Sequence, residues 1–228
     1  MTYRQIINSV LRRLREETFG GDWTGALIDS TTATDYQILI GDFVNEVKRE
    51  VEDAWDWTSL RRVETVATVA DSRTYTIPGT SQRTRLLSVQ EQEQGQMLQG
   101  VPDSWIRSTQ YPSPDSSGVP SYFSINSTVS GLGEVGALRA QLYPKPDQVY
   151  NVNYYVVDPQ DDLTNATDVL TCPEFPVIMG VWARAIAERG EDGGTLSDMA
   201  QMQYQQALSD AIQQDVGRHS DEVIWNGV

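Results

Sequence analysis

The chain has 228 residues, enough for one domain or for one domain with a large insertion, and its formal net charge is −15. Its 32 acidic residues outnumber 17 lysines and arginines. This disfavours a protein whose surface as a whole grips nucleic acid, because affinity for phosphates comes mostly from basic side chains.

The chain shows no pattern of a secreted or membrane protein. The start has charges inside its apolar pattern and lacks the apolar core of a signal peptide. No later stretch approaches the ~20 apolar residues of a membrane span. We therefore expect a soluble intracellular product.

An amphipathic helix is predicted over residues 2–17. Apolar side chains recur there at helical spacing, and Thr2 with Gln5 has the form of a capping box, in which each side chain bonds the other residue's backbone. The opposite face of this helix is basic and carries Arg4, Arg12, Arg13 and Arg15.

A second helix is predicted near residues 35–57, where Thr34 and Gln37 repeat the capping pattern. From about Arg61 the apolar period changes to two, which is typical of strands. The predicted strands are 61–69, 73–77, 85–90, 121–126, 138–143 and 150–157, with a hairpin formed by the first two and a short helix over 102–110. Strands at this spacing favour a small antiparallel sandwich or barrel.

The helical period returns at Phe175, and a partner helix is predicted over residues 197–215. The order of helices, strands and helices predicts an α+β fold, in which the terminal α-helices form a helical bundle with an inserted antiparallel β-sandwich or barrel domain. The predicted parts are N-terminal helices of the bundle at 1–60, the inserted β-domain at 61–165, a C-terminal helical hairpin at 166–219 and an extended tail at 220–228.

Residues with catalytic chemistry are few. The only histidine, His219, follows the last predicted helix, where a solvated residue is far more common than a general base. The only cysteine, Cys172, excludes an intrachain disulfide and a zinc cluster of thiolates, and it fits a small buried hydrophobe. The best acidic candidates lie in predicted turns, where aspartate is favoured for its local backbone bonds. They are Asp158, Asp161, Asp162, Glu191 and Asp192. We expect no enzyme, no cofactor and no metal site.

Several short features follow one another in a fixed order along residues 3–217. They are Asn45 to Val47, Trp55 to Leu60, Tyr75 to Pro78, Val119 to Phe123, Leu142 to Asp147, Tyr150 to Tyr155, Asp161 to Leu163, Cys172 to Glu174, Arg184 with Ala185, Gly190 to Asp192, and Tyr204 with Ala207. Taken together they resemble the head-to-tail adaptor (head-tail connector) family of tailed phages, which includes the tail tubular protein A of short-tailed phages. The ordered series, not any single element, carries the resemblance.

The resemblance implies a dodecameric ring at the virion neck, between the portal and the tail, assembled in the host cytoplasm. The implied partners are other copies of the chain, the portal protein and a tail or nozzle protein, with no membrane. DNA would pass through the ring without sequence recognition. Carboxylates lining such a channel would repel phosphates and let DNA slide.

A closed ring needs a heterologous interface, in which one surface patch meets a different patch on the neighbour. The arginine face formed by Arg4, Arg12, Arg13 and Arg15 is a candidate for this contact, opposite an acidic neighbour. A solvated charged face explains the same pattern at least as well.

The tail at 220–228 contains an apolar triplet, Val223, Ile224 and Trp225. We expect this triplet to bind the portal, either with Trp225 in a pocket or by pairing as an edge strand. Folding of the triplet back onto the chain's own helices is an alternative of comparable weight.

The second candidate function is a tail-associated receptor- or carbohydrate-binding β-module. Its stacking surface would be made of Trp105, Tyr111, Tyr122 and Phe123. Aromatic residues in strands more often belong to a core, so this function ranks below the adaptor, and a glycosidase ranks third.

Overall fold

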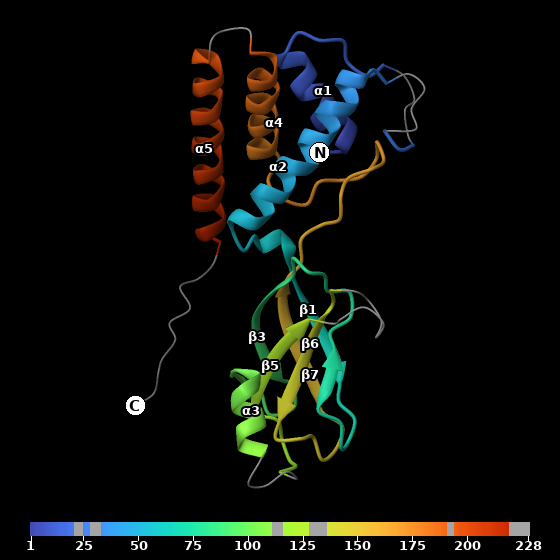
Figure 1. Cartoon of the computed structure of the whole chain (residues 1–228), viewed down its shortest axis with the longest axis vertical. Coiled ribbons are helices and arrows are strands. Elements are labelled where there is room, and N and C mark those ends of the chain that lie inside the picture. The colour runs from blue at the N-terminus through green and yellow to red at the C-terminus, as the bar shows by residue number, and fades with distance from the viewer. Residues whose placement is uncertain (21–24, 28–32, 111–115, 128–135, 191–193, 219–228) are drawn as a thin grey trace. The chain divides into compact units, whose positions relative to one another are not determined.

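The computed structural model of the chain describes residues 1–20, 25–27, 33–110, 116–127, 136–190 and 194–218. In these ranges the chain forms five α-helices and two β-sheets, which confirms the predicted α+β class (Figure 1). The chain divides into two compact units. Unit 1 contains residues 1–60 and the described residues from 160 onward, and unit 2 contains Arg61–Pro159.

Helix α1 spans Tyr3–Arg13 and begins at the predicted capping box. The Thr2 amide donates to Gln5 Oε1 at 2.9 Å, and the Gln5 amide donates to Thr2 Oγ1 at 3.4 Å. The helix ends before the predicted residue 17, because Arg15 takes a left-handed φ of 59° that cannot continue a helix. Its buried face is formed by Tyr3, Ile6, Ile7, Val10 and Leu11.

Helix α2 spans Asp35–Ala54 and has the same reciprocal pair of bonds between Thr34 and Gln37, at 3.2 and 3.0 Å. It ends earlier than predicted because Trp55 is extended, with a φ of −153°. A short 3-10 helix, Thr58–Leu60, closes this part of unit 1.

Helix α4, Glu174–Arg189, contacts α1, α2 and the last helix, α5, which spans Thr195–Val216. A glycine allows this close approach. A methyl group at Gly180 would lie 2.6 Å from Val47 Cγ1 on α2 and 3.0 Å from Tyr204 Cε2 on α5. The absence of a side chain at this position therefore sets the distance between three helices.

An ion pair inside unit 1 fixes the point at which the chain returns from unit 2. Lys48 and Glu52 lie one turn apart on α2, both are fully buried, and their charged atoms are 3.2 Å apart. Lys48 Nζ also donates to the Gln160 carbonyl oxygen at 2.5 Å, and the Gln160 amide donates to Glu52 Oε1 at 3.2 Å. Because a buried charge needs a partner and hydrogen bonds, the pair and the backbone of Gln160 depend on one another.

A second buried carboxylate holds the segment by which the chain leaves unit 1. Asp215 lies near the end of α5, and its Oδ2 accepts from Trp55 Nε1 at 3.2 Å and from the Thr58 amide at 3.0 Å. The neighbouring Trp57 is also buried and donates to the Val51 carbonyl oxygen at 2.6 Å. The end of α2 is thereby tied to the end of α5.

Unit 2 contains seven strands and one helix in its described residues. They are β1 (Arg61–Ala67), β2 (Thr74–Thr76), β3 (Arg85–Glu91), β4 (Gln99–Gly100), α3 (Asp103–Gln110), β5 (Tyr122–Ser127), β6 (Leu138–Tyr143) and β7 (Asn151–Val157). One sheet has the strand order β1-β7-β3 and is antiparallel. The other has the order β2-β6-β5-β4, and its short β4 pairs parallel to β5.

The hairpin predicted from β1 and β2 is wrong, because the two strands belong to different sheets. β1 pairs with β7, and β2 pairs with β6. The side chain of Tyr75 fixes the turn between them: its hydroxyl donates to the Ser72 carbonyl oxygen at 2.8 Å and accepts from the Val69 amide at 3.2 Å. The turn residues are therefore held by a side chain from β2, not by pairing of β1 with β2.

One hydrophobic core contains side chains from both sheets of unit 2. Alternate residues of β7 enter it, as the strand period requires. Its buried members are Tyr75, Ile77, Val89, Leu98, Ala140, Leu142, Val152, Tyr154 and Val156.

We predict that Lys48→Ala destabilises unit 1 by about 3–5 kcal/mol, because it leaves the Glu52 carboxylate buried without its cation. Urea unfolding followed by far-ultraviolet circular dichroism measures this loss, since the long helices belong to unit 1. The matched control is Arg49→Ala, which removes an exposed ion pair to Asp162 and should cost at most about 1 kcal/mol. Equal losses from the two substitutions would contradict the role given to the buried pair.

Gly180→Ala should lower the Tm of unit 1 although alanine is the better helix former. The added methyl group overlaps side chains on α2 and α5, and overpacking of this kind costs about 1–3 kcal/mol. Gly20→Ala is the control, because a methyl group there has no atom within 4 Å. A Tm for Gly180→Ala at or above that of the unaltered chain would show that a methyl group fits between α4 and its neighbours, and would contradict this prediction.

Candidate functional site

The arginine face predicted on the first helix lies on the outer side of α1. Arg12, Arg13 and Arg15 are exposed, and Arg4 is half-buried in the first turn. Two of these four residues, Arg4 and Arg12, line a hollow of about 590 Å³, which we name the α1 hollow. Its other lining residues are Met1, Gln5, Asn8 and Phe19. Arg13 and Arg15 are not among the residues that line it.

The arginines at the end of α1 differ from those on α4 in their ion pairs. Arg184 and Arg189 pair with carboxylates from α2 and from the segment after α1. Arg12, Arg13 and Arg15, by contrast, form no ion pair with any residue in the described ranges. In a chain with a net charge of −15, such a cluster attracts an acidic partner.

Three aromatic rings meet on unit 2. The ring of Trp105 on α3 lies 4.9 Å from that of Tyr122 on β5 and 5.9 Å from that of Tyr143 on β6, centroid to centroid. Of the predicted stacking surface, Trp105 and Tyr122 are thus together, Phe123 packs against the core, and Tyr111 lies outside the described residues. Tyr143 is not among the predicted stacking residues, because its position opposite Tyr122 follows from the strand register.

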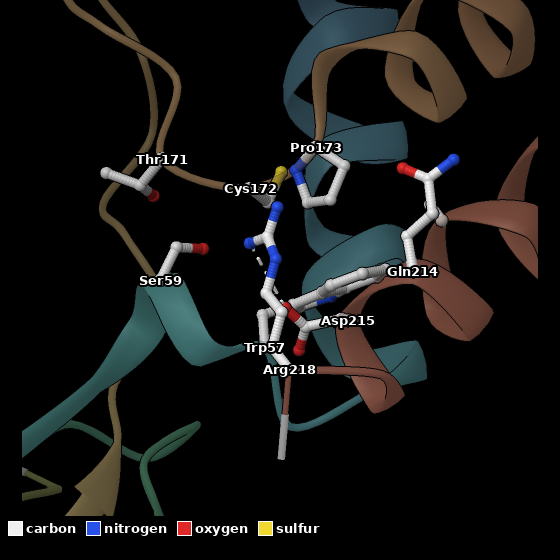
Figure 2. A pocket seen from close by; sticks show the side chains of 9 residues that line it. Trp57, Ser59, Thr171, Cys172, Pro173, Gln214, Asp215 and Arg218 are labelled. Atoms are coloured by element: carbon white, nitrogen blue, oxygen red, sulfur yellow. Dashed lines mark ion pairs between the residues drawn. The ribbon is translucent and has the colours of Figure 1, made fainter. Parts of the chain in front are cut away.

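A pocket of about 210 Å³ lies in unit 1, where α5 ends (Figure 2). It is lined by Trp57, Ser59, Thr171, Cys172, Pro173, Ala211, Gln214, Asp215 and Arg218. Arg218 Nη1 lies 3.5 Å from Asp215 Oδ1, while the other oxygen of this carboxylate binds Trp55 and Thr58. Both oxygens of the Asp215 carboxylate therefore already have partners within the chain.

Cys172 lies in the wall of this pocket but is buried, as predicted. Burial, followed by the nearby carboxylate of Glu52, raises the pKa of the Cys172 thiol to about 12. At neutral pH the sulfur is therefore protonated, and a protonated thiol is a poor nucleophile and a poor metal ligand.

Of the five acidic residues considered for catalysis, the structure describes three, and two of these form ion pairs. In unit 2, Asp158 Oδ2 lies 3.1 Å from Arg62 Nη2. In unit 1, Asp162 pairs with Arg49, and Asp161 is exposed. The remaining candidates, Glu191, Asp192 and His219, lie outside the described residues.

The described ranges contain no group of three or more His, Cys, Asp or Glu side chains placed to hold a metal ion. They also contain no helix that combines the length and the apolar character needed to cross a membrane. The tail residues Val223, Ile224 and Trp225 lie outside these ranges, so their binding to a portal stays a prediction.

Sequence reasoning missed the outer face of α5. The helical period identified the side that packs on α4, and the remaining positions resemble ordinary solvent-facing residues. The composition of α5 does indicate an unusual surface, because among its 22 residues this helix has three acidic side chains and no basic one.

Comparison with known proteins places the chain in a family. No curated protein matches it. The model of one family, described as SU10 adaptor protein, matches residues 1–225 and thus covers both units. This confirms the predicted phage adaptor at the level of the family, whereas the resemblance to tail tubular protein A in particular stays a prediction. Because the match spans nearly the whole chain, the protein belongs to the SU10 adaptor protein family.

Proposed function

We propose that this chain is a structural head-to-tail adaptor of a tailed phage. Copies of it form a dodecameric ring at the virion neck, between the portal and the tail, around the channel through which DNA passes. The observation that carries the proposal is the match of the SU10 adaptor family to residues 1–225. The partners are other copies, the portal protein and a tail or nozzle protein, and the chain catalyses no reaction.

The charge of the chain supports this role. Its net charge is −15, and the exposed side of α2 is rich in carboxylates. These are Asp35, Asp42, Glu46, Glu50 and Asp53. A ring with such a balance repels phosphates, so DNA slides through it instead of binding.

We further propose the finer architecture that the sequence predicts. The helices of unit 1 form a bundle around α4, which is supported by the contacts of α4 with α1, α2 and α5. The two sheets of unit 2 face each other as a sandwich, which is supported by the single buried cluster to which both contribute.

One observation favours a second function, a receptor- or carbohydrate-binding module. The cluster of Trp105, Tyr122 and Tyr143 is partly open to solvent, since Trp105 is 37% exposed. The three rings pack on one another, however, and a sugar-stacking site needs an open ring face. This function therefore ranks below the adaptor.

A phage that lacks this chain should fill its heads with DNA but fail to attach tails. Electron microscopy of the lysate measures the fraction of tailed particles, and a plasmid that supplies the chain should restore it. Tailed particles at the normal frequency in its absence would contradict the adaptor role. Complete tailed particles that no longer adsorb to the host would instead support the receptor-binding function.

The tail residues provide a more local test. Deletion of residues 220–228 should abolish binding to purified portal rings, measured by co-sedimentation, and should leave the thermal transition unchanged. Replacement of Val223, Ile224 and Trp225 by serine should have the same effect. Asp221→Asn with Glu222→Gln is the matched control and should retain binding. Unchanged affinity of the deletion would eliminate the tail as the portal contact.

A further inference from the structure

The outer face of α5 has an exposed apolar stripe. Leu196, Met199 and Met202 are 44%, 53% and 71% exposed. They follow one another at three-residue spacing, so they are neighbours on the helix surface. Methionine is flexible and polarizable, and it is enriched at protein interfaces relative to the rest of the surface.

The same helix is depleted of charge. Its only charged residues are Asp198, Asp210 and Asp215, and the last of these is buried. The exposed part of α5 is otherwise filled mainly by glutamine, whereas the exposed side of α2 is rich in carboxylates. Depletion of charge around an apolar stripe is the composition that distinguishes the centre of an interface from the rest of a surface.

The α1 hollow offers positive charge and an apolar residue to a partner. Its lining positions recur every three or four residues along α1, on the side opposite the buried face of that helix. Phe19 contributes an apolar surface, and Arg4 and Arg12 contribute positive charge. A helix with an apolar stripe and the exposed carboxylates of Asp198 and Asp210 is therefore a suitable occupant.

The two surfaces lie on different sides of unit 1. Helix α4 contacts both α1 and α5, and Figure 1 shows α5 and α1 on opposite sides of α4. A contact between them must therefore join two copies of the chain. Such a contact is heterologous, and repeated contacts of this kind close into a ring when the rotation between copies allows it.

We infer that the outer face of α5 in one copy occupies the α1 hollow of the next copy. The stripe of Leu196, Met199 and Met202 packs into the hollow, and Asp198 and Asp210 face its arginines. This contact makes α1 and α5 the two sides of a ring subunit. It rests on the proposed ring and specifies which surfaces build it.

The test uses substitutions on the surface, which should leave the fold intact. The double variant Met199→Asp and Met202→Asp puts negative charge into the stripe, and Arg12→Glu reverses charge in the hollow. Each should weaken assembly on portal rings by about tenfold or more at low salt, as like charges at an interface do. Val149→Asp, at an equally exposed apolar residue of unit 2, is the control and should assemble normally. Circular dichroism checks the fold of each variant.

Cross-linking tests the head-to-tail direction. Because Cys172 is buried, a bismaleimide reagent should report on engineered cysteines at exposed positions. Chains carrying both Met202→Cys and Arg13→Cys, an exposed position beside the hollow, should yield a ladder of linked oligomers, and chains carrying either one alone should yield none. Linked dimers from Met202→Cys alone would show that α5 meets α5, which overturns the inference.

Failure of this inference differs from failure of the proposed function. If the unaltered chain forms no ring on the portal, the adaptor role itself fails. If the unaltered chain forms rings and both charge variants form them equally well, the ring uses other surfaces and only the contact between α5 and the α1 hollow is refuted.

Discussion

The buried ion pair of Lys48 and Glu52 fixes the course of the chain through unit 1. Lys48 binds the carbonyl oxygen of Gln160, and Glu52 binds its amide. The first residue after unit 2 is thereby fixed to α2. Asp215 does the same for the segment around Thr58, through which the chain leaves. Because the cost of closing a loop grows only slowly with its length, a large insertion is tolerated when both ends are held in this way.

The proposed assembly depends on how unit 1 distributes its side chains. Helix α4 buries a broad apolar surface and is crowded enough that Gly180 must lack a side chain, which leaves the exposed sides of α1 and α5 free to meet the proposed partners. Unlike α4, α5 buries only one narrow side, formed by Ala200, Tyr204, Ala207 and Asp215. A helix of 22 residues that is buried so little leaves a long surface for a neighbour.

Local signals predicted much of this fold. Both capping boxes form at Thr2 and Thr34, and every strand except the short β4 lies near a predicted range, because these features depend on short-range backbone bonds and on the period of apolar residues. The pairing of β1 with β7 was not predictable in the same way, since the partners are about 90 residues apart in sequence. A lysine on an amphipathic helix is usually solvated, and the burial of Lys48 depends on its bond to Gln160 far along the chain.

The candidate surfaces were predictable to different degrees. The arginines of α1 stand out in an acidic sequence, but only the fold shows that Arg4 and Arg12 share a hollow and that Arg13 does not line it.

The central claim is that copies of this chain assemble with a portal. Negative-stain electron microscopy of the purified chain mixed with its cognate portal tests it most directly. The account predicts a second ring stacked on one end of each portal, and portals that remain bare at every concentration of the chain would contradict it.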